Sequence, residues 1–362
     1  MRLVVFGLSV SSAWGNGHAA LWRGLIRALL REGHRVTFFE RDAPWYAAHR
    51  DLAALPEGGA LLLYRDWTEA APAAHAALAG SDAAIVTSYC PDGVAATRLV
   101  LDSRVALRCF YDMDTPVTLA RHAAGESLGY IGPEGLGGFD LVLSYTGGPA
   151  LAALRERFGA RRVQPFYGWV DPTHYVPVRP DGAIAALSYL GTYAADRQAM
   201  LEHLFVAPAR LRPASRFALG GAQYPHDFPW TDNIFFRRHV PPAAHPAFYA
   251  ASRLTLNVTR APMARMGWCP SGRLFEAAAC GVPILSDAWP GLADFFTPGE
   301  EILVADTTAD ACAALDRDDA ELARIAARAR ARTLAEHSAE RRARQLCALL
   351  QDATATQPAR AG

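Results

Sequence analysis

The sequence predicts an α/β protein made of two domains, each with an open parallel sheet. Short continuous apolar runs alternate with amphipathic stretches, which is typical of buried parallel strands separated by helices. A proline-rich segment interrupts this alternation near the middle of the chain, and the alternation then starts again. At 362 residues the chain is also too long for one typical core. A cleft between two such domains is the default place for a ligand.

The first half of the chain begins with a buried strand and an amphipathic helix. The helix ends at Gly33, because glycine readily adopts the left-handed conformation that closes a helix. Strands are predicted at 3–8, 35–40, 83–89, 105–112 and 140–146, and helices at 18–32, 92–101 and 149–158. Such alternation favours a parallel sheet, since each helix carries the chain back to start the next strand.

The segment YGWVDPTHYVPVRPDG (167–182) has little periodicity and is predicted to be a linker. After it we predict strands at 185–193, 216–221, 233–240, 254–260, 282–287 and 301–305, and helices at 195–205, 246–253, 272–280 and within 309–351. The predicted domains are therefore 1–170 and 171–350, with the final helix a candidate to pack back on the first domain. A flexible tail is predicted at 354–362.

Composition excludes several classes of function. The formal net charge is +0, which argues against a large nucleic-acid surface, and no apolar run is long enough to span a membrane. All 36 basic residues are arginine, so that a phosphate clamp must use guanidinium groups. The six cysteines form no CxxC pair, which disfavours a zinc site. The start of the chain does not resemble a signal peptide, and cytoplasmic residence is the expectation.

The loop GNGHAA (15–20) superficially resembles a dinucleotide fingerprint. The third glycine is missing, because Ala20 stands in its place, and no suitable ribose carboxylate is apparent. We interpret Gly15, Asn16 and Gly17 as a loop at the carboxyl end of the first strand that faces a ligand. His18, which opens the following helix, is either a functional residue or a solvated residue of its first turn.

A carboxylate lies inside the apolar stretch PSGRLFEAAACGVPILSD (270–287). Ser271 or Gly272 can cap the helix, which leaves free N–H groups at its start, and Arg273 adds a charged donor. This combination indicates an anion site. Glu276 is then either a buried structural acceptor or a ligand for hydroxyl groups, and a ribose diol would suit a carboxylate.

The stretches SGRLFEAAACGVPILSD and GLADFFTPGEEILV resemble the C-terminal domain of GT-B glycosyltransferases. The form Arg-Leu-Phe-Glu-Ala resembles the spore-maturation (CgeB-like) branch of the group 1 transferases. Four more segments are similar to that family: GWVDPTHYVPV, YLGTYAADR, HVPPAAHPAFYAASRLTLNVTR and RTLAEHSAERRARQLCALL. The resemblance is specific over 165–350 and architectural over 1–165. It implies a GT-B fold, in which two Rossmann-like domains, an acceptor-side domain and then a donor domain, face each other across a cleft.

The resemblance also implies roles for individual residues of the donor domain. Glu276 matches the glutamate that binds the nucleotide ribose. Arg197 follows the loop that contains Gly191 and Thr192, and it matches a position that grips the diphosphate. Arg273 is a second candidate for that role.

Further positions concern the base and the sugar. His239 and Val240 lie where the base-contacting loop of the family is expected. The usual motif has a second glutamate eight residues before Glu276, and this chain has Trp268 there instead. Arg260 or Arg265 could fill part of that gap, or could be an ordinary surface arginine.

The acceptor side is less defined. YDMDTP (111–116) follows a predicted strand of the first domain and allows three interpretations. It is a metal site, a structural turn, or a place where Asp112 or Asp114 faces an acceptor hydroxyl as general base or orienting group. We prefer the third interpretation, with His18 as a competitor for the same role, and we predict no metal site and no cofactor.

The function predicted from these residues is a hexosyltransferase-like glycosyltransferase. It would move a sugar from a nucleotide-diphosphate donor to an acceptor hydroxyl without a metal, and the resemblance implies retention of the anomeric configuration. The acceptor would be a glycan, a protein, a lipid or a small molecule, and no nucleic-acid partner is expected. The alternatives are a non-catalytic GT-B-like assembly protein and a nucleotide-sugar epimerase of the same fold.

Overall fold

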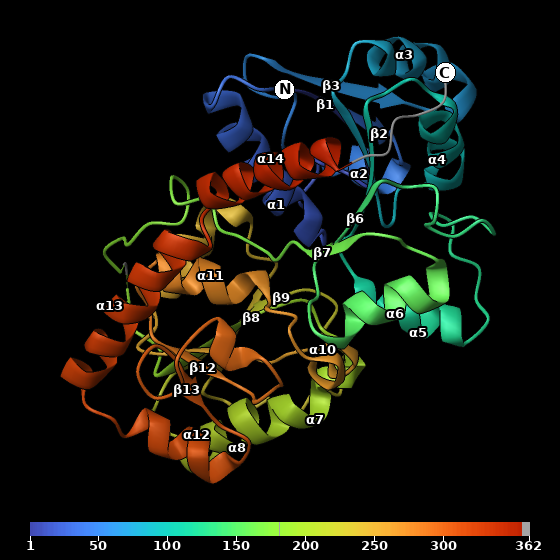
Figure 1. Cartoon of the computed structure of the whole chain (residues 1–362). Coiled ribbons are helices and arrows are strands. Elements are labelled where there is room, and N and C mark those ends of the chain that lie inside the picture. The colour runs from blue at the N-terminus through green and yellow to red at the C-terminus, as the bar shows by residue number, and fades with distance from the viewer. Residues whose placement is uncertain (181, 357–362) are drawn as a thin grey trace. The chain divides into compact units, whose positions relative to one another are not determined.

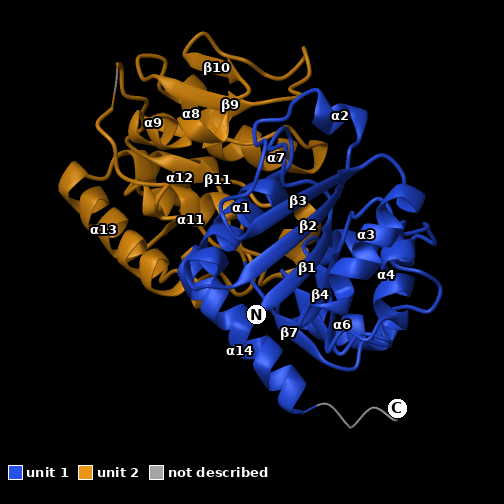
Figure 2. Ribbon diagram, turned by 90° about the horizontal axis from the view of Figure 1, so that it is seen from above, with its two compact units in different colours: residues 1–167, 339–362 blue, residues 168–338 orange. Residues whose placement is uncertain are grey.

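The computed structural model describes residues 1–180 and 182–356, and it divides the chain into two compact units. Unit 1 contains residues 1–167 and returns at 339, and unit 2 contains residues 168–338 (Figure 2). Of the predicted flexible tail, residues 354 and 355 continue the last helix, whereas 357–362 lie outside the described residues.

Unit 1 has a parallel sheet that contains seven strands among the described residues, in the order β3-β2-β1-β4-β5-β6-β7 (Figure 1). The strands are β1 (Arg2–Gly7), β2 (Arg35–Arg41), β3 (Gly59–Tyr64), β4 (Ala83–Thr87), β5 (Leu107–Asp112), β6 (Leu141–Ser144) and β7 (Val163–Pro165). The order reverses between β1 and β4, and loops at the carboxyl ends of strands beside such a reversal are favoured ligand positions.

The helices of unit 1 come from both ends of the chain. They are α1 (Gly17–Arg31), α2 (Pro44–Ala47), α3 (Trp67–Ala79), α4 (Gly93–Asp102), α5 (Thr115–Ala123), α6 (Pro149–Phe158) and α14 (Ala339–Ala355). The last helix, α14, packs against α1. Arg342 Nε donates to the Tyr167 carbonyl at 2.9 Å, and Cys347 Sγ lies 3.2 Å from His34 Nε2.

Unit 2 repeats the arrangement with a parallel sheet in the order β10-β9-β8-β11-β12-β13. Its strands are β8 (Leu187–Leu190), β9 (Phe217–Gly221), β10 (Ile234–Arg238), β11 (Thr255–Asn257), β12 (Ile284–Ser286) and β13 (Leu303–Val304). Its α-helices are α7 (Gln198–Leu201), α8 (Ala207–Leu211), α9 (His245–Ala250), α10 (Ala261–Met266), α11 (Gly272–Ala279), α12 (Thr308–Leu315) and α13 (Asp319–Glu336). A π-helical turn at Glu202–Val206 joins α7 to α8.

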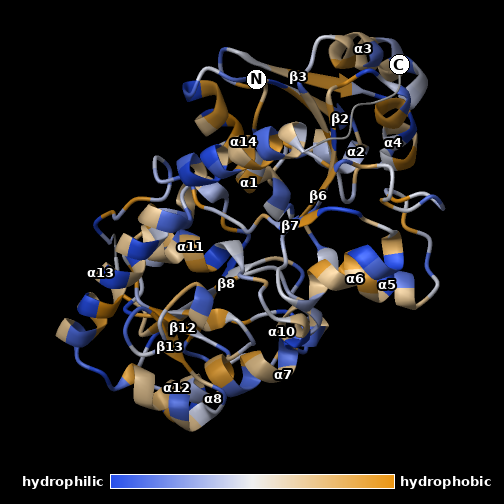
Figure 3. Cartoon of the chain, in the orientation of Figure 1, coloured by the Kyte–Doolittle hydropathy of each residue, from blue (hydrophilic) through white to orange (hydrophobic). Residues whose placement is uncertain are grey.

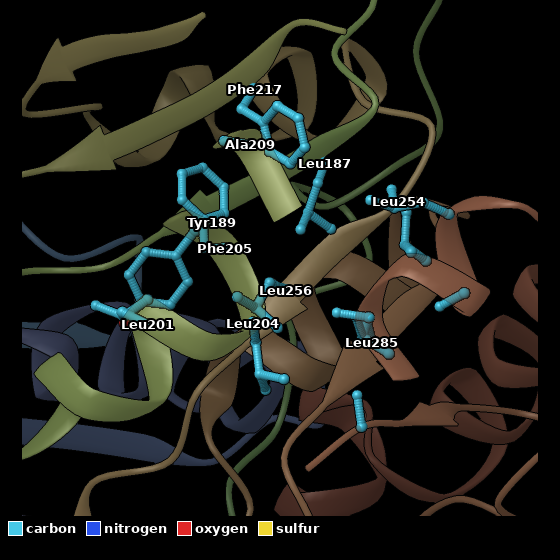
Figure 4. Close-up of a cluster of buried hydrophobic side chains, with 14 of the residues drawn as sticks. Leu187, Tyr189, Leu201, Leu204, Phe205, Ala209, Phe217, Leu254, Leu256 and Leu285 are labelled. Carbon is cyan, nitrogen blue, oxygen red and sulfur yellow. The ribbon is translucent and has the colours of Figure 1, made fainter. Parts of the chain in front are cut away.

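The core of unit 2 lies between its sheet and the helices α7, α8, α12 and α13, and part of it is drawn in Figure 4. Leu187, Leu204, Phe205, Phe217 and Leu256 are all fully buried there. Hydrophobic and hydrophilic stretches alternate along α13 (Figure 3), as expected for a helix that buries one face. Among residues 1–180 and 182–356, no helix combines the length and the apolar character needed to cross a membrane.

The prediction of two α/β domains with parallel sheets is confirmed, although some elements of unit 1 were missed. The strand β3 lies at the edge of its sheet, where Leu62 and Leu63 remain more than one-third exposed, so that it lacks the continuous burial of a central strand. The helix α3 contains Pro72, which in a sequence normally indicates a helix end. The helix α5 begins with Thr-Pro directly after a polar turn, and the sequence there predicts only the turn.

Candidate functional sites

In unit 2, the chain makes a very close crossing where β8 and β9 end. The Gly191 N–H donates to the Gly220 carbonyl at 2.9 Å, and a Cβ atom at Gly221 would lie 2.0 Å from the Gly191 carbonyl oxygen. Gly221 also has a φ of +154°, which L-residues with side chains rarely adopt. Glycine is therefore required here, and the crossing holds the loop 191–197 at the carboxyl end of the sheet.

Arg273, in the first turn of α11, reaches back to the same strand end. Its Nε donates to the Leu190 carbonyl, and its Nη1 donates to Asn257 Oδ1 at 2.9 Å. Its guanidinium carbon lies 5.1 Å from the centroid of the Tyr189 ring, which is a cation–π distance. A Cβ atom at Gly191 would lie 2.8 Å from Arg273 Nη2, so the missing side chain at that position makes room for the guanidinium group.

Arg197 provides a second guanidinium group to this region. Its Nη1 donates to the Thr192 carbonyl at 3.2 Å, whereas its Nε is buried without a hydrogen-bond partner in the described part of the chain. Burial lowers the pKa of Arg197, and the charges of Arg273 and Arg260 lower it further against the opposing effect of Tyr189. A buried donor without a partner, close to like charges, is a site that an anion would stabilise.

A cavity of about 570 Å³ opens beside these groups. Residues 192–197 line it together with Gln223 and Arg260. Arg260 Nε donates to Asp196 Oδ2 at 3.1 Å, so that this lining arginine already has a carboxylate partner. Arg197 is therefore the lining cation whose charge is less compensated, and it is the one we expect a bound anion to contact.

The start of α11 adds backbone donors. Ser271 is the N-cap residue in an extended conformation, and its side chain makes no capping hydrogen bond. Gly272 opens the helix and places no side chain at its first position. The Leu274 N–H donates to the Ser271 carbonyl at 3.0 Å, whereas the N–H groups of Gly272 and Arg273 keep their capacity to donate.

Glu276 lies one turn further along α11, inside a network of polar side chains. The Tyr249 hydroxyl donates to Glu276 Oε2 at 3.3 Å, and His245 Nδ1 lies 3.7 Å from the same oxygen. Burial raises the pKa of Glu276, but the interactions with His245, Arg273 and Tyr175 outweigh burial, and the pKa lies below its ordinary value. An ionised carboxylate in this place is suited to accept hydrogen bonds from the hydroxyl groups of a ligand.

His245 connects Glu276 to the loop predicted to contact a base. Its Nε2 donates to the Val240 carbonyl at 3.1 Å, and its Nδ1 lies 3.2 Å from the Tyr175 hydroxyl. His239 precedes Val240 with a φ of +55°, and its N–H donates to the Gly221 carbonyl at 2.7 Å. The sequence did not single out His245. Its spacing from Tyr249, one helical turn along α9, is the signal that could have found it.

Trp268 and Arg265 stand before α11. The Trp268 Nε1 donates to Asp294 Oδ2 at 2.6 Å, and a Cβ atom at Gly291 would lie 2.6 Å from its ring, so that the indole covers the glycine backbone. Trp268 has a φ of +44°, which is strained for a large side chain. Arg265 is exposed on α10 and does not line the cavity, which leaves Arg260 as the arginine of that pair placed beside it.

In unit 1, a buried carboxylate holds the loop that follows β1. Glu40, in β2, is fully buried, and it accepts hydrogen bonds from the Ser9 hydroxyl and from the N–H groups of Val10 and Ser11 at 2.7–2.9 Å. The Ser11 hydroxyl also donates to it. Because its oxygens are already used, Glu40 is not available to a ribose, which argues against a dinucleotide site at this loop.

The same loop presents His18 to Asp114. Asn16 caps α1 by accepting from the His18 N–H at 3.1 Å, and its amide donates to the carbonyls of Ser9 and Ser12. His18 Nε2 lies 2.7 Å from Asp114 Oδ2. Because an ionised carboxylate can only accept, this nitrogen carries a proton, and in the neutral imidazole the lone pair is then on Nδ1. That Nδ1 is buried and has no partner within the described residues.

Asp112, in contrast, does not reach the surface. It is fully buried at the end of β5, where it accepts from the Asp114 N–H at 3.1 Å and from the Thr118 hydroxyl at 3.0 Å. Burial, followed by the neighbouring charge of Asp114, raises the pKa of Asp112 to about 7 against the effect of these hydrogen bonds. Asp112 thus holds the turn in place, whereas Asp114 is partly exposed and contacts His18.

Asp112→Asn is expected to remove a loss of stability at higher pH. The Asp112 carboxyl binds its proton more tightly in the folded protein than in the unfolded chain. The contribution of Asp112 to the free energy of unfolding therefore falls as the pH rises from 4 to 7, by at most about 4 kcal/mol. Chemical denaturation across that range measures the difference between variant and natural protein. The exposed Asp232→Asn serves as the control, and parallel curves for Asp112→Asn and the natural protein would contradict the prediction.

Comparisons with known proteins agree with this architecture. Residues 197–348 match a family model described as glycosyl transferase-like, and no curated protein matches the sequence. Sucrose-phosphate synthase from Thermosynechococcus elongatus superposes with a TM-score of 0.76 at 17% identity, over 98% of this chain and 100% of that chain. Anabaena HepE in complex with UDP and glucose gives a TM-score of 0.70 at 14% identity, over 97% and 100%. A glycosyltransferase from Rickettsia africae gives 0.68 at 11% identity, over 98% and 99%. The chain therefore has the GT-B fold, and its residues 197–348 match the glycosyl transferase-like family.

Proposed function

We propose that the chain is a hexosyltransferase-like glycosyltransferase that moves a sugar from a nucleoside diphosphate to an acceptor hydroxyl. The observation that carries this proposal is the grouping of Arg197, Arg273 and Glu276 at the carboxyl end of the unit 2 sheet. It offers uncompensated positive charge for a diphosphate and an ionised carboxylate for a ribose. The solved HepE structures contain UDP, glucose or UDP-glucose, which supports a UDP-sugar as the first donor to test.

The other donor residues follow from this arrangement. Gly191 and Thr192 bring backbone groups to the diphosphate, and the N–H groups behind Ser271 and Gly272 provide further donors. His239 and Val240 form the loop that receives the base, tied to Glu276 through His245. Guanidinium groups and helix N–H groups stabilise a leaving diphosphate without a metal ion, which is why metal independence belongs to the proposal.

On the acceptor side, we assign the proton transfer to His18, held in one tautomer by Asp114. The acceptor oxygen forms the new bond to the anomeric carbon, the bond from that carbon to the diphosphate breaks, and the acceptor proton passes to Nδ1 of His18. Since Nδ1 is buried, the proposal requires that the loop flanked by Gly15 and Gly17 admits the acceptor. The CgeB-like branch and cytoplasmic residence stay part of the same proposal.

We also propose that the transfer retains the anomeric configuration, and this part of the proposal rests on the resemblance to group 1 transferases. Retention requires the acceptor hydroxyl to approach on the face that the diphosphate leaves, whereas attack on the opposite face inverts the configuration. Proton NMR of the first product formed distinguishes the two through the coupling constant of the new anomeric proton. An inverted product would overturn this part while leaving transfer itself intact.

A calorimetric screen of UDP, GDP, dTDP, CDP and ADP, with and without Mg²⁺, tests the donor side. Saturable binding of UDP without Mg²⁺ is expected. If no nucleotide binds, the chain is a non-catalytic GT-B-like protein. If UDP-glucose is converted into a different nucleotide sugar without any acceptor, the chain is an epimerase.

Glu276→Gln is expected to weaken UDP binding by about 1–3 kcal/mol, because it replaces the ionised acceptor of the ribose hydroxyls by a neutral amide. Isothermal calorimetry measures the change. Glu300→Gln is the matched control, since Glu300 is an exposed glutamate of the same unit, paired with Arg328. Equal UDP affinity for Glu276→Gln and the control would defeat the assignment of Glu276.

A further inference from the structure

Three aromatic rings lie in contact in unit 1, one pair stacked and the other tilted. The His49 ring is stacked on Trp14, with ring centroids 4.4 Å apart, and it also contacts Trp45 at 5.2 Å. Trp45 is 56% exposed, an unusual position for the largest apolar side chain. We call Trp14, Trp45 and His49 the aromatic platform. Its exposed indole is available for contact with a ligand rather than used in the core.

The aromatic platform is fastened to the loop that leads to His18. The Ser12 hydroxyl donates to the His49 carbonyl at 2.9 Å, and the Asp51 N–H donates to the Ser11 carbonyl at 3.1 Å. Trp14 itself lies on that loop, four residues before His18. The platform thus joins the loop after β1, which leads to the proposed proton acceptor, to the segment after β2 that carries Trp45 and His49.

The backbone between Trp14 and His18 borders open space. A Cβ atom at Gly15 or at Gly17 would meet no atom within 4 Å in the described structure. Gly15 also has a φ of +60°, so that any residue with a side chain would be strained at this position. A ligand that contacts the exposed Trp45 can therefore extend along this backbone toward His18 without meeting a side chain at Gly15 or Gly17.

Paired charges surround the platform and define the chemistry of its ligand. Arg50 Nη2 donates to Asp42 Oδ1 at 2.5 Å, and Arg23 holds Asp51 with two hydrogen bonds. Two arginines and two aspartates carry no net charge, which disfavours an anionic ligand such as a nucleic acid. Carboxylates accept hydrogen bonds from hydroxyl groups, and guanidinium groups donate hydrogen bonds to them. The apolar faces of sugar rings pack on aromatic rings.

We propose that the acceptor is a neutral sugar chain, one ring of which packs on the aromatic platform while its next hydroxyl is presented to His18. This inference rests on the proposed function and names its acceptor class. The platform then acts as a positioning surface: it binds the acceptor and leaves donor binding unchanged.

The test measures acceptor binding without any donor. The probes are neutral oligosaccharides with α- and β-linked glucose, galactose, mannose and N-acetylglucosamine, observed by saturation-transfer NMR and calorimetry. At least one is expected to bind the natural protein, and Trp45→Ala is expected to weaken that binding about 3- to 10-fold. Trp14→Ala should act in the same direction. Because Trp45 is exposed, its replacement should leave the melting temperature unchanged, and this keeps the test valid if Trp14→Ala fails to fold.

Phe235→Ala is the control, since Phe235 is a similarly exposed aromatic residue of unit 2. The proposal is overturned if no oligosaccharide binds, if Trp45→Ala binds as the natural protein does, or if a charged probe such as a dT oligonucleotide binds in place of the sugars. UDP titration separates this from the proposed function. Normal UDP affinity with no sugar binding rejects the platform alone, whereas loss of both would reject the transferase.

Discussion

Replacing His18 by Asn is expected to lower the turnover number about 10²- to 10⁴-fold while the affinity for UDP stays the same. The reason lies in the geometry of unit 1. Asp114 accepts a hydrogen bond from His18 Nε2 at 2.7 Å, and the lone pair on Nδ1 of the neutral imidazole is then the proton acceptor. Asparagine can still donate to Asp114, but it provides no comparable base. Steady-state release of UDP from UDP-glucose in the presence of an acceptor measures the change.

The control for His18 is His75→Asn, because His75 is exposed on α3. Asp114→Asn tests the second half of the pair, since an amide can also accept or donate and no longer fixes one tautomer of His18. It should lower turnover in the same direction. Near-normal turnover in the His18 variant, with UDP binding intact, would remove His18 from the reaction and leave Asp114 as the acceptor-facing group.

Replacing Arg197 by Gln is expected to lower the affinity for UDP by about 10- to 100-fold, because a charge-assisted hydrogen bond contributes about 1.5–3 kcal/mol. The same substitution should raise the stability of the free protein. Arg197 is partly buried near Arg273 and Arg260, and its buried Nε has no partner within the described residues, so the substitution removes a desolvated charge and a repulsion from the free protein. Calorimetry and thermal melting together measure both effects.

Opposite shifts of affinity and stability would identify Arg197 as a residue retained for binding. Arg324→Gln, on the exposed face of α13, provides the control for both measurements. Higher salt should weaken UDP binding to the natural protein more than to the Arg197 variant, since one phosphate contact has been removed. A variant that loses stability and keeps its affinity would show that Arg197 is structural.

Patterns that depend on neighbouring residues were predictable, and contacts between distant residues were not. The helix over α11 followed from its apolar face and from Gly281, which ends it with a φ of +74°. Central strands were read from their continuous apolar runs, because both faces of a parallel sheet are covered. The edge strand β3 and the proline-containing α3 lack these signals, and both were missed.

The same distinction holds for the candidate sites. His18 and Asp114 were both named from the sequence, yet their contact joins residues 96 positions apart, and no local pattern announces it. Glu40 and His245 were not named, because each acts through partners brought close by the fold. The different depths of Asp112 and Asp114, two residues apart, also depend on the packing around β5.

The pairing of α14 with α1 has a consequence for how the protein is made. Synthesis proceeds from the N-terminus, and domains usually fold in that order. Here the last helix completes the unit that the first residues begin, while residues 168–338 form the other unit without interruption. Residues 168–338 can thus fold before α14 has been synthesised, whereas unit 1 must keep the apolar surface of α1 uncovered until residues 339–355 are available. Chaperone protection would matter most for the N-terminal half, although it emerges first.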